Sequence, residues 1–259
     1  MSDKILSYHN DANLKELIIN EMKNHQVQDR FIKGSYGTYD DSGEFRGCAI
    51  ACAVNSVNKT MGKHYDTKSH EALSEVLGIP AWLFKVQDSF FECLPSELGS
   101  QFAIDFLESI PIGIDLEPIR WNLCTYLLKE GIETMGEKDN LFKEVMEEAL
   151  EALRHSLMLY EGAIKTNSWN YEFSKLHVKK LERLALKANI HFTKNISHIV
   201  NMSLQSIKVD EDSVQKMFFS STLGSGGEIA TSQHIETAYA AHANELLSLL
   251  KSSGEQLAH

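Results

Sequence analysis

The sequence predicts an all-α fold, and three observations support this. Apolar residues recur at spacings of three and four through most of the chain, no stretch alternates long enough to build a sheet, and no segment is repeated. We expect an N-terminal helical domain with a small irregular or hairpin insertion over residues 1–135, followed by a C-terminal helical bundle over residues 136–259. All four prolines and all four cysteines lie in the first domain, which places the boundary near residue 135.

The N-terminal domain opens with a predicted helix from about Asp11, which can cap it, and the apolar face of that helix reaches His25. Glycines and aspartates make residues 34–47 a loop or a small hairpin. The uncharged run 48–54 has mostly small side chains, which favours a buried helix that begins at Gly47. Further helices are expected over residues 69–77, 81–93, about 102–110 and 116–129.

The C-terminal domain is expected to contain four or five amphipathic helices with short connections, which is typical of a bundle. Asp139 can cap a long helix that continues to Leu157, and a turn at residues 224–227 leads into the last helix, where His242 lies on the apolar side. The remaining helices are expected over residues 169–189, 196–209 and 212–222.

Composition excludes several classes of partner. The chain has 25 Lys+Arg against 36 Asp+Glu, a net charge of −11, which argues against nucleic acid or an anionic membrane as the main partner. The sequence predicts no signal peptide and no membrane span. Four cysteines are too few for a disulfide framework in a chain of 259 residues, so we expect reduced thiols and a cytoplasmic protein. Export without a signal peptide stays open as an alternative.

Cys48 is the first candidate for chemistry. It follows Gly47 at the expected start of a buried helix, where free backbone amides and the helix dipole stabilise a thiolate. A nucleophilic cysteine also needs a base, and His25 or His70 can serve, with Asp29 or Asp88 to orient it. Our candidate catalytic residues are Cys48, His25 and Asp29. The competing interpretation is that Cys48 and Cys52 are small core residues.

A second candidate site combines two polar pairs. His25 with Asp29 and Asp88 with Glu92 are each spaced i, i+4, so each pair shares one face of a helix. Two such helices in contact supply nitrogen and oxygen ligands for a metal ion. The competing interpretation is a solvated or hydrogen-bonded polar face, and the sequence assigns no metal and no cofactor.

Five segments of the N-terminal domain form a recognisable series. They are residues 25–36, Gly47–Cys52 (Gly-Cys-Ala-Ile-Ala-Cys), Leu77–Pro80 (Leu-Gly-Ile-Pro), Asp88–Pro95 and Phe106–Leu116. In this order they resemble a family of bacterial and phage proteins, and the resemblance covers about residues 8–130. Ala51 and Asn55 depart from that pattern, in which glycine and histidine are usual. The family has no known activity, so the resemblance implies no site residues.

Two functions follow as expectations. The plain acidic helices and the lack of a complete catalytic signature favour a protein that binds another macromolecule. The alternative is a cysteine-dependent hydrolase or transferase with Cys48 as nucleophile and His25 as base. The expected partner is another protein or a small-molecule substrate, with no nucleic acid and no membrane insertion.

Overall fold

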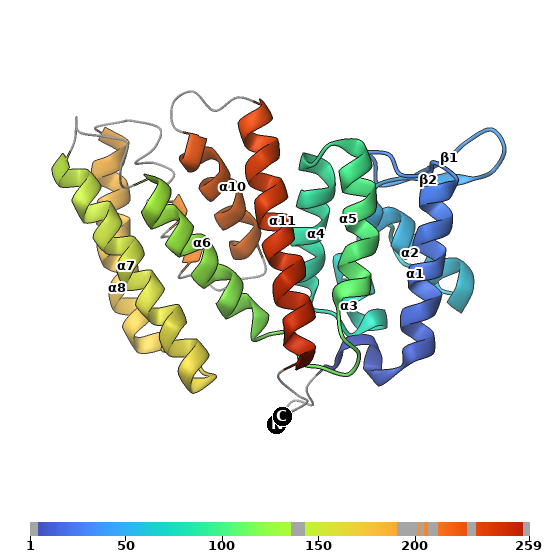
Figure 1. Ribbon diagram of the computed structural model, residues 1–259, viewed down its shortest axis with the longest axis horizontal. Coiled ribbons are helices and arrows are strands. Elements are labelled where there is room, and N and C mark those ends of the chain that lie inside the picture. Colours follow the sequence, from blue (N-terminus) through green and yellow to red (C-terminus); the bar gives the residue numbers. More distant parts are fainter. Residues whose placement is uncertain are drawn as a thin grey trace. The chain divides into compact units, whose positions relative to one another are not determined.

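Helices dominate the structure, a computed structural model that describes residues 5–135, 143–190, 201–202, 205–206, 212–226 and 232–255. The all-α prediction is confirmed, since most of the described residues are helical (Figure 1). The expected hairpin is present as well. Its strands β1 (Thr38–Tyr39) and β2 (Phe45–Arg46) pair antiparallel, with Thr38 opposite Arg46.

The described chain divides into two compact units. Unit 1 comprises the described residues up to Glu117 and from Tyr239 onward, and unit 2 comprises those between Pro118 and Ala238. These divisions differ from the boundary expected after residue 135. The last helix contributes to unit 1 because Tyr239 packs edge-on against Phe90, with the ring centroids 5.8 Å apart.

The helices of unit 1 pack around an aromatic core. α2 packs against α1, α3 and α4, and α4 packs against α5. Trp82, Phe84, Phe90, Phe91 and Phe106 are all fully buried. The helices of this unit are α1 (Ala12–Val27), α2 (Ala49–Met61), α3 (His70–Leu77), α4 (Ala81–Cys93), α5 (Ser96–Ser109) and the part of α11 (Ser232–Glu255) that begins at Tyr239.

The chain direction in unit 1 is set by local signals that the sequence shows. The side chain of Asp11 accepts from the backbone N–H of Asn13 and caps α1, and Ser69 caps α3 in the same way. Gly78 ends α3 in the left-handed conformation, with φ of 62°. Ile79 and Pro80 follow, and α4 begins at Ala81. These signals explain why residues 69–77 and 81–93 were predictable as separate helices.

Unit 2 is built around a second aromatic cluster. Trp121 stacks on Trp169 with centroids 5.4 Å apart, and Tyr160 lies against both rings. The helices of unit 2 are α6 (Ile119–Met135), α7 (Lys143–Thr166), α8 (Tyr171–Ile190) and α10 (Ser213–Gly226), with the first residues of α11. Residues 224–226, expected in a turn, continue α10. Most of the helix expected over residues 196–209 lies outside the described residues.

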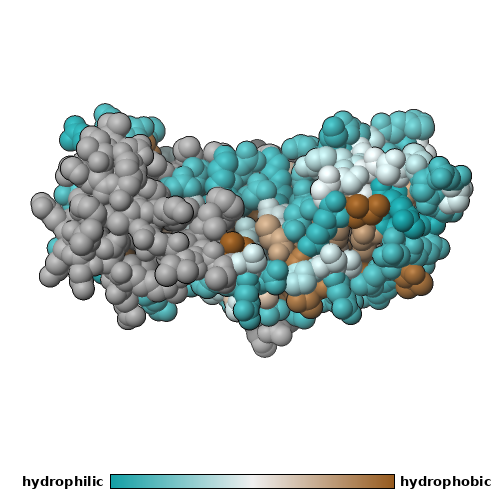
Figure 2. All heavy atoms as spheres, turned by 90° about the horizontal axis from the view of Figure 1, so that it is seen from above, coloured by the Kyte–Doolittle hydropathy of each residue, from teal (hydrophilic) through white to brown (hydrophobic). Residues whose placement is uncertain are grey.

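The surface agrees with the acidic, polar composition. The face shown in Figure 2 is mostly hydrophilic where the chain is described, with a few hydrophobic side chains between the polar ones. Among the described helices, we find none with both the length and the apolar character that crossing a bilayer requires.

Candidate functional site

The first part of the site is the N-terminus of α2. Cys48 is the residue immediately before that helix and is only 2% exposed. Its backbone N–H donates to the carbonyl of Ser35 over 2.6 Å, which fixes the start of the helix. Gly47 is required there because a Cβ at this position would lie 3.0 Å from the backbone of Gly37. The Gly-Cys-Ala sequence therefore places a buried sulfur at a helix N-terminus.

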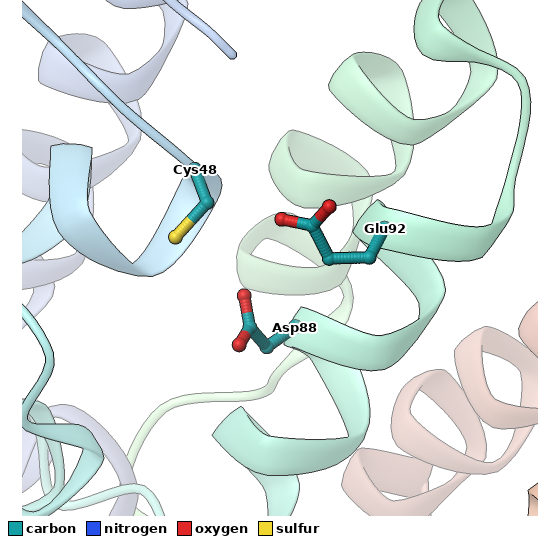
Figure 3. Close-up of side chains that lie close together, drawn as sticks. All are labelled: Cys48, Asp88 and Glu92. Carbon is teal, nitrogen blue, oxygen red and sulfur yellow. The ribbon is translucent and has the colours of Figure 1, made fainter. Parts of the chain in front are cut away.

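The second part of the site is one face of α4. Asp88 and Glu92 are spaced i, i+4, so both carboxylates project from the same side of the helix. Figure 3 shows Cys48, just before α2, across from these two carboxylates on α4. One ligand atom from each of the three residues lies within 4.8 Å of the other two. A thiol at the start of α2 and two carboxylates on α4 therefore lie close together. We call these three residues the Cys48–Asp88–Glu92 cluster.

The surroundings hold Glu92 in place. Its Oε2 accepts the backbone N–H of Gly34 over 2.8 Å. Lys33 donates through Nζ to the backbone carbonyl of Glu92 at 3.2 Å, and also to that of Leu94. The loop that precedes the β1–β2 hairpin thus fastens the end of α4 beside the cluster.

Asp88 is held differently, because its two oxygens have different surroundings. Oδ2 lies 3.5 Å from Nε2 of His70, and both side chains are only 14% exposed. Oδ1 is buried and accepts no hydrogen bond from any residue that the structure describes. A buried carboxylate oxygen without a donor is unfavourable unless another positive group occupies the space beside it.

The electrostatics of the cluster disfavour three negative charges. Burial, and then the charge of Asp88, raises the pKa of the Cys48 thiol to about 12, although the backbone N–H groups of Ala51 and Ile50 act in the opposite direction. Burial is also the main cause that raises the pKa of Glu92. The charge of Asp88, followed by burial and Cys48, raises the pKa of the half-exposed Tyr36. In each case the shift disfavours the negatively charged form of the side chain.

The three residues proposed from sequence do not form one group. Cys48 is in the cluster. His25 is buried, and its Nε2 lies 3.0 Å from Oγ of Ser56. Burial, and then Arg30 and Lys59, lowers the pKa of His25 to about 4. Asp29 is exposed in the turn after α1. Across the described residues, no hydrogen bond or ion pair joins His25 or Asp29 to Cys48, and their catalytic roles stay predictions.

The second choice of base and orienting acid, His70 and Asp88, does lie side by side. The pair Asp88 and Glu92 lies beside Cys48 at the start of α2. In the described part of the chain it does not meet the other polar pair, His25 and Asp29, as a two-helix metal site would require. Sequence reasoning did not place Glu92 next to Cys48. The only signal for it was the i, i+4 spacing, which does not say which neighbour the polar face of α4 meets.

Comparisons with protein-family models, with curated proteins and with solved structures found no match. The resemblance to a bacterial and phage family therefore stays a prediction, and a functional interpretation rests on the geometry of the cluster.

Proposed function

We propose that unit 1 binds a divalent transition-metal ion, with a preference for Zn²⁺, through Cys48, Asp88 and Glu92. The observation that carries this proposal is the cluster itself, with one sulfur and two carboxylate oxygens within 4.8 Å of one another. Zn²⁺ is bound at about 2.3 Å by sulfur and at about 2.0–2.2 Å by oxygen in a tetrahedral arrangement, which places ligand atoms roughly 3.5 Å apart. A closing movement of about 1 Å brings the three atoms to that spacing.

The ligand types favour zinc over the harder cations. Mg²⁺ and Ca²⁺ prefer oxygen ligands alone, whereas a thiolate selects softer ions. Cys48 lies at a helix N-terminus, where the backbone N–H groups of Ala51 and Ile50 favour its charged form. Three protein ligands are also the number that catalytic zinc sites use, with the fourth position left for water or substrate.

The raised pKa of Cys48 also fits a metal ligand better than it fits a free nucleophile. A nucleophilic cysteine works as a thiolate and needs a lowered pKa, but the pKa of Cys48 is raised to about 12 by burial and by Asp88. A bound metal ion deprotonates its thiol ligand outright, and its two positive charges offset two of the three negative charges of the thiolate and the carboxylates. A cysteine-dependent hydrolase with Cys48 and His25 therefore stays a prediction that has less support than metal binding.

The proposal is tested with Co²⁺, which replaces Zn²⁺ in such sites and whose absorption spectrum depends on the ligands that bind it. We expect chelator-treated protein to bind one equivalent of Co²⁺ with a thiolate-to-metal charge-transfer band and the strong visible bands of a four-coordinate ion, and we expect Zn²⁺ to displace it. Cys48→Ser should abolish the charge-transfer band. Cys93→Ser is the control, because Cys93 also lies in unit 1 and is a free thiol that is partly buried. Absence of the band in the unmodified protein, or its persistence in Cys48→Ser, would exclude the site.

A second function, the protein binding expected from composition, is supported by a different observation. α7 and α8 expose five large apolar side chains. They are Met158, Ile164, Tyr171, Phe173 and Leu176. Exposed apolar side chains that gather into a contiguous patch mark surfaces that bind other proteins.

This second proposal predicts that charge on α8 blocks partner binding. We expect Phe173→Glu with Leu176→Glu to lose a partner that is cross-linked to the unmodified chain in cells and identified by mass spectrometry. Val27→Glu is the control, because Val27 is 84% exposed in unit 1. An unchanged set of cross-linked partners in the α8 variant would contradict the proposal.

A further inference from the structure

His70 lies in the layer of residues that surrounds the Cys48–Asp88–Glu92 cluster. It is the first residue of α3, and Ser69 caps that helix by accepting the backbone N–H of Ala72. This cap fixes the position of the His70 backbone relative to α3. The imidazole Nε2 is buried, makes no hydrogen bond with the described residues, and has Oδ2 of Asp88 at 3.5 Å as its ionic neighbour. The distance is slightly too long for a hydrogen bond and short enough to become one after a small movement.

The two oxygens of Asp88 therefore differ in their surroundings. Oδ2 faces His70, while within the described part of the chain the buried Oδ1 accepts no hydrogen bond. A carboxylate that binds a metal ion through one oxygen is commonly held by a hydrogen-bond donor at the other, and such a donor fixes the orientation of the ligand. The closing movement that brings Asp88 to a metal ion is of the same order as the movement that shortens its contact with His70.

We infer that His70 is a positioning residue for the metal site, which holds Oδ2 of Asp88 through Nε2–H so that Oδ1 is presented to the ion. This inference rests on the proposed function, because it assigns a role toward the ion that the cluster binds. His70 is not a ligand in this arrangement. The imidazole restricts rotation of the Asp88 carboxylate and satisfies the oxygen that the ion leaves free.

Two substitutions of His70 differ in where they place a hydrogen-bond donor. The side-chain amide nitrogen of glutamine reaches approximately the position of Nε2, whereas that of asparagine reaches only the position of Nδ1. His70→Gln therefore keeps a donor for Oδ2 of Asp88, and His70→Asn removes it while leaving a polar side chain at the start of α3. Both residues tolerate a helix N-terminus, so a difference between the two variants reports the position of the donor.

We expect His70→Asn to weaken Zn²⁺ binding about 10- to 100-fold, the usual effect of losing a hydrogen bond to a metal ligand. His70→Gln should stay within about threefold of the unmodified protein. The measurement is competition for Zn²⁺ against a chromophoric chelator, with circular dichroism to verify folding. His64→Asn is the control, because His64 is exposed in the loop that leads to α3.

The Co²⁺ spectrum separates failure of this inference from failure of the proposed function. In His70→Asn the thiolate charge-transfer band should remain, since Cys48 still binds, while the visible bands change because Asp88 is reoriented. If the unmodified protein shows no charge-transfer band, the metal site itself is excluded. If Co²⁺ binds and both His70 variants match the unmodified protein, only the role of His70 is overturned. Equal losses in His70→Gln and His70→Asn would also overturn it, because they would make the imidazole a ligand.

Discussion

Saturating Zn²⁺ is expected to raise the melting temperature of unit 1 by roughly 5–10 °C. A ligand that binds only the folded state adds about 2.7 kcal/mol to the free energy of unfolding when it is present at 100 times its Kd. Each kcal/mol raises the melting temperature by about 2–4 °C in chains of 150–250 residues. Scanning calorimetry with and without Zn²⁺ measures this shift, and an excess of chelator should reverse it. A melting temperature that Zn²⁺ leaves unchanged or lowers would contradict the proposed site.

Glu92→Gln is the matched control for this shift. Glutamine keeps an oxygen that accepts the backbone N–H of Gly34, but it lacks the charge that the ion needs. We expect this variant to show no Zn²⁺-dependent shift. Because burial raises the pKa of Glu92 in the folded state, its ionisation favours unfolding. The contribution of Glu92 to stability is thus fully present below its ordinary pKa and is lost as the pH rises through the raised value.

The stability of the metal-free protein should therefore not fall in Glu92→Gln at neutral pH. That result separates a residue that serves function from one that serves the fold, because ordinary substitutions of partly buried side chains destabilise a protein. A Glu92→Gln protein that melts well below the unmodified protein without Zn²⁺ would make Glu92 a structural residue.

Much of the fold was predictable from local patterns. The uncharged run after Gly47 does form a buried helix, and Gly78, Ile79 and Pro80 do separate two helices. Those signals act over a few residues, so one sequence is enough to read them. The place of the last helix was not predictable, because the contact of Tyr239 with Phe90 joins residues far apart in the chain. Periodicity tells which face of a helix is apolar and does not tell which helix covers it.

The site was predictable in the same partial way. Cys48 was identified by its position before a helix, and the shared face of Asp88 and Glu92 was identified by spacing. What the sequence did not provide was the packing that brings the carboxylates of α4 to the start of α2. His25 was chosen as the base, but it lies on a face of α1 that packs against α2. There its Nε2 is hydrogen-bonded to Oγ of Ser56. The nearer histidine to Asp88 is His70, which is adjacent only after α3 and α4 pack together.

Gly78→Ala is expected to destabilise unit 1 by about 3 kcal/mol or more, one of the largest effects that a single methyl group can have here. Gly78 has φ of 62°, and a Cβ at this position would lie 2.1 Å from the backbone carbonyl oxygen of Leu6. Backbone cannot move aside as a flexible side chain can. The strain would fall on the connection between α3, which carries His70, and α4, which carries Asp88, so metal affinity should decrease as well.

Gly62 provides an internal comparison for this effect. It ends α2 with φ of 63°, almost the same conformation, but a Cβ there would meet nothing within 4 Å. Gly62→Ala should therefore lose only about 1–2 kcal/mol, the conformational term for a left-handed residue other than glycine. Urea unfolding of both variants measures the two losses under the same conditions. Equal losses would mean that conformation alone sets the requirement for glycine, and that the close approach of Leu6 to the turn between α3 and α4 does not constrain the positions of His70 and Asp88.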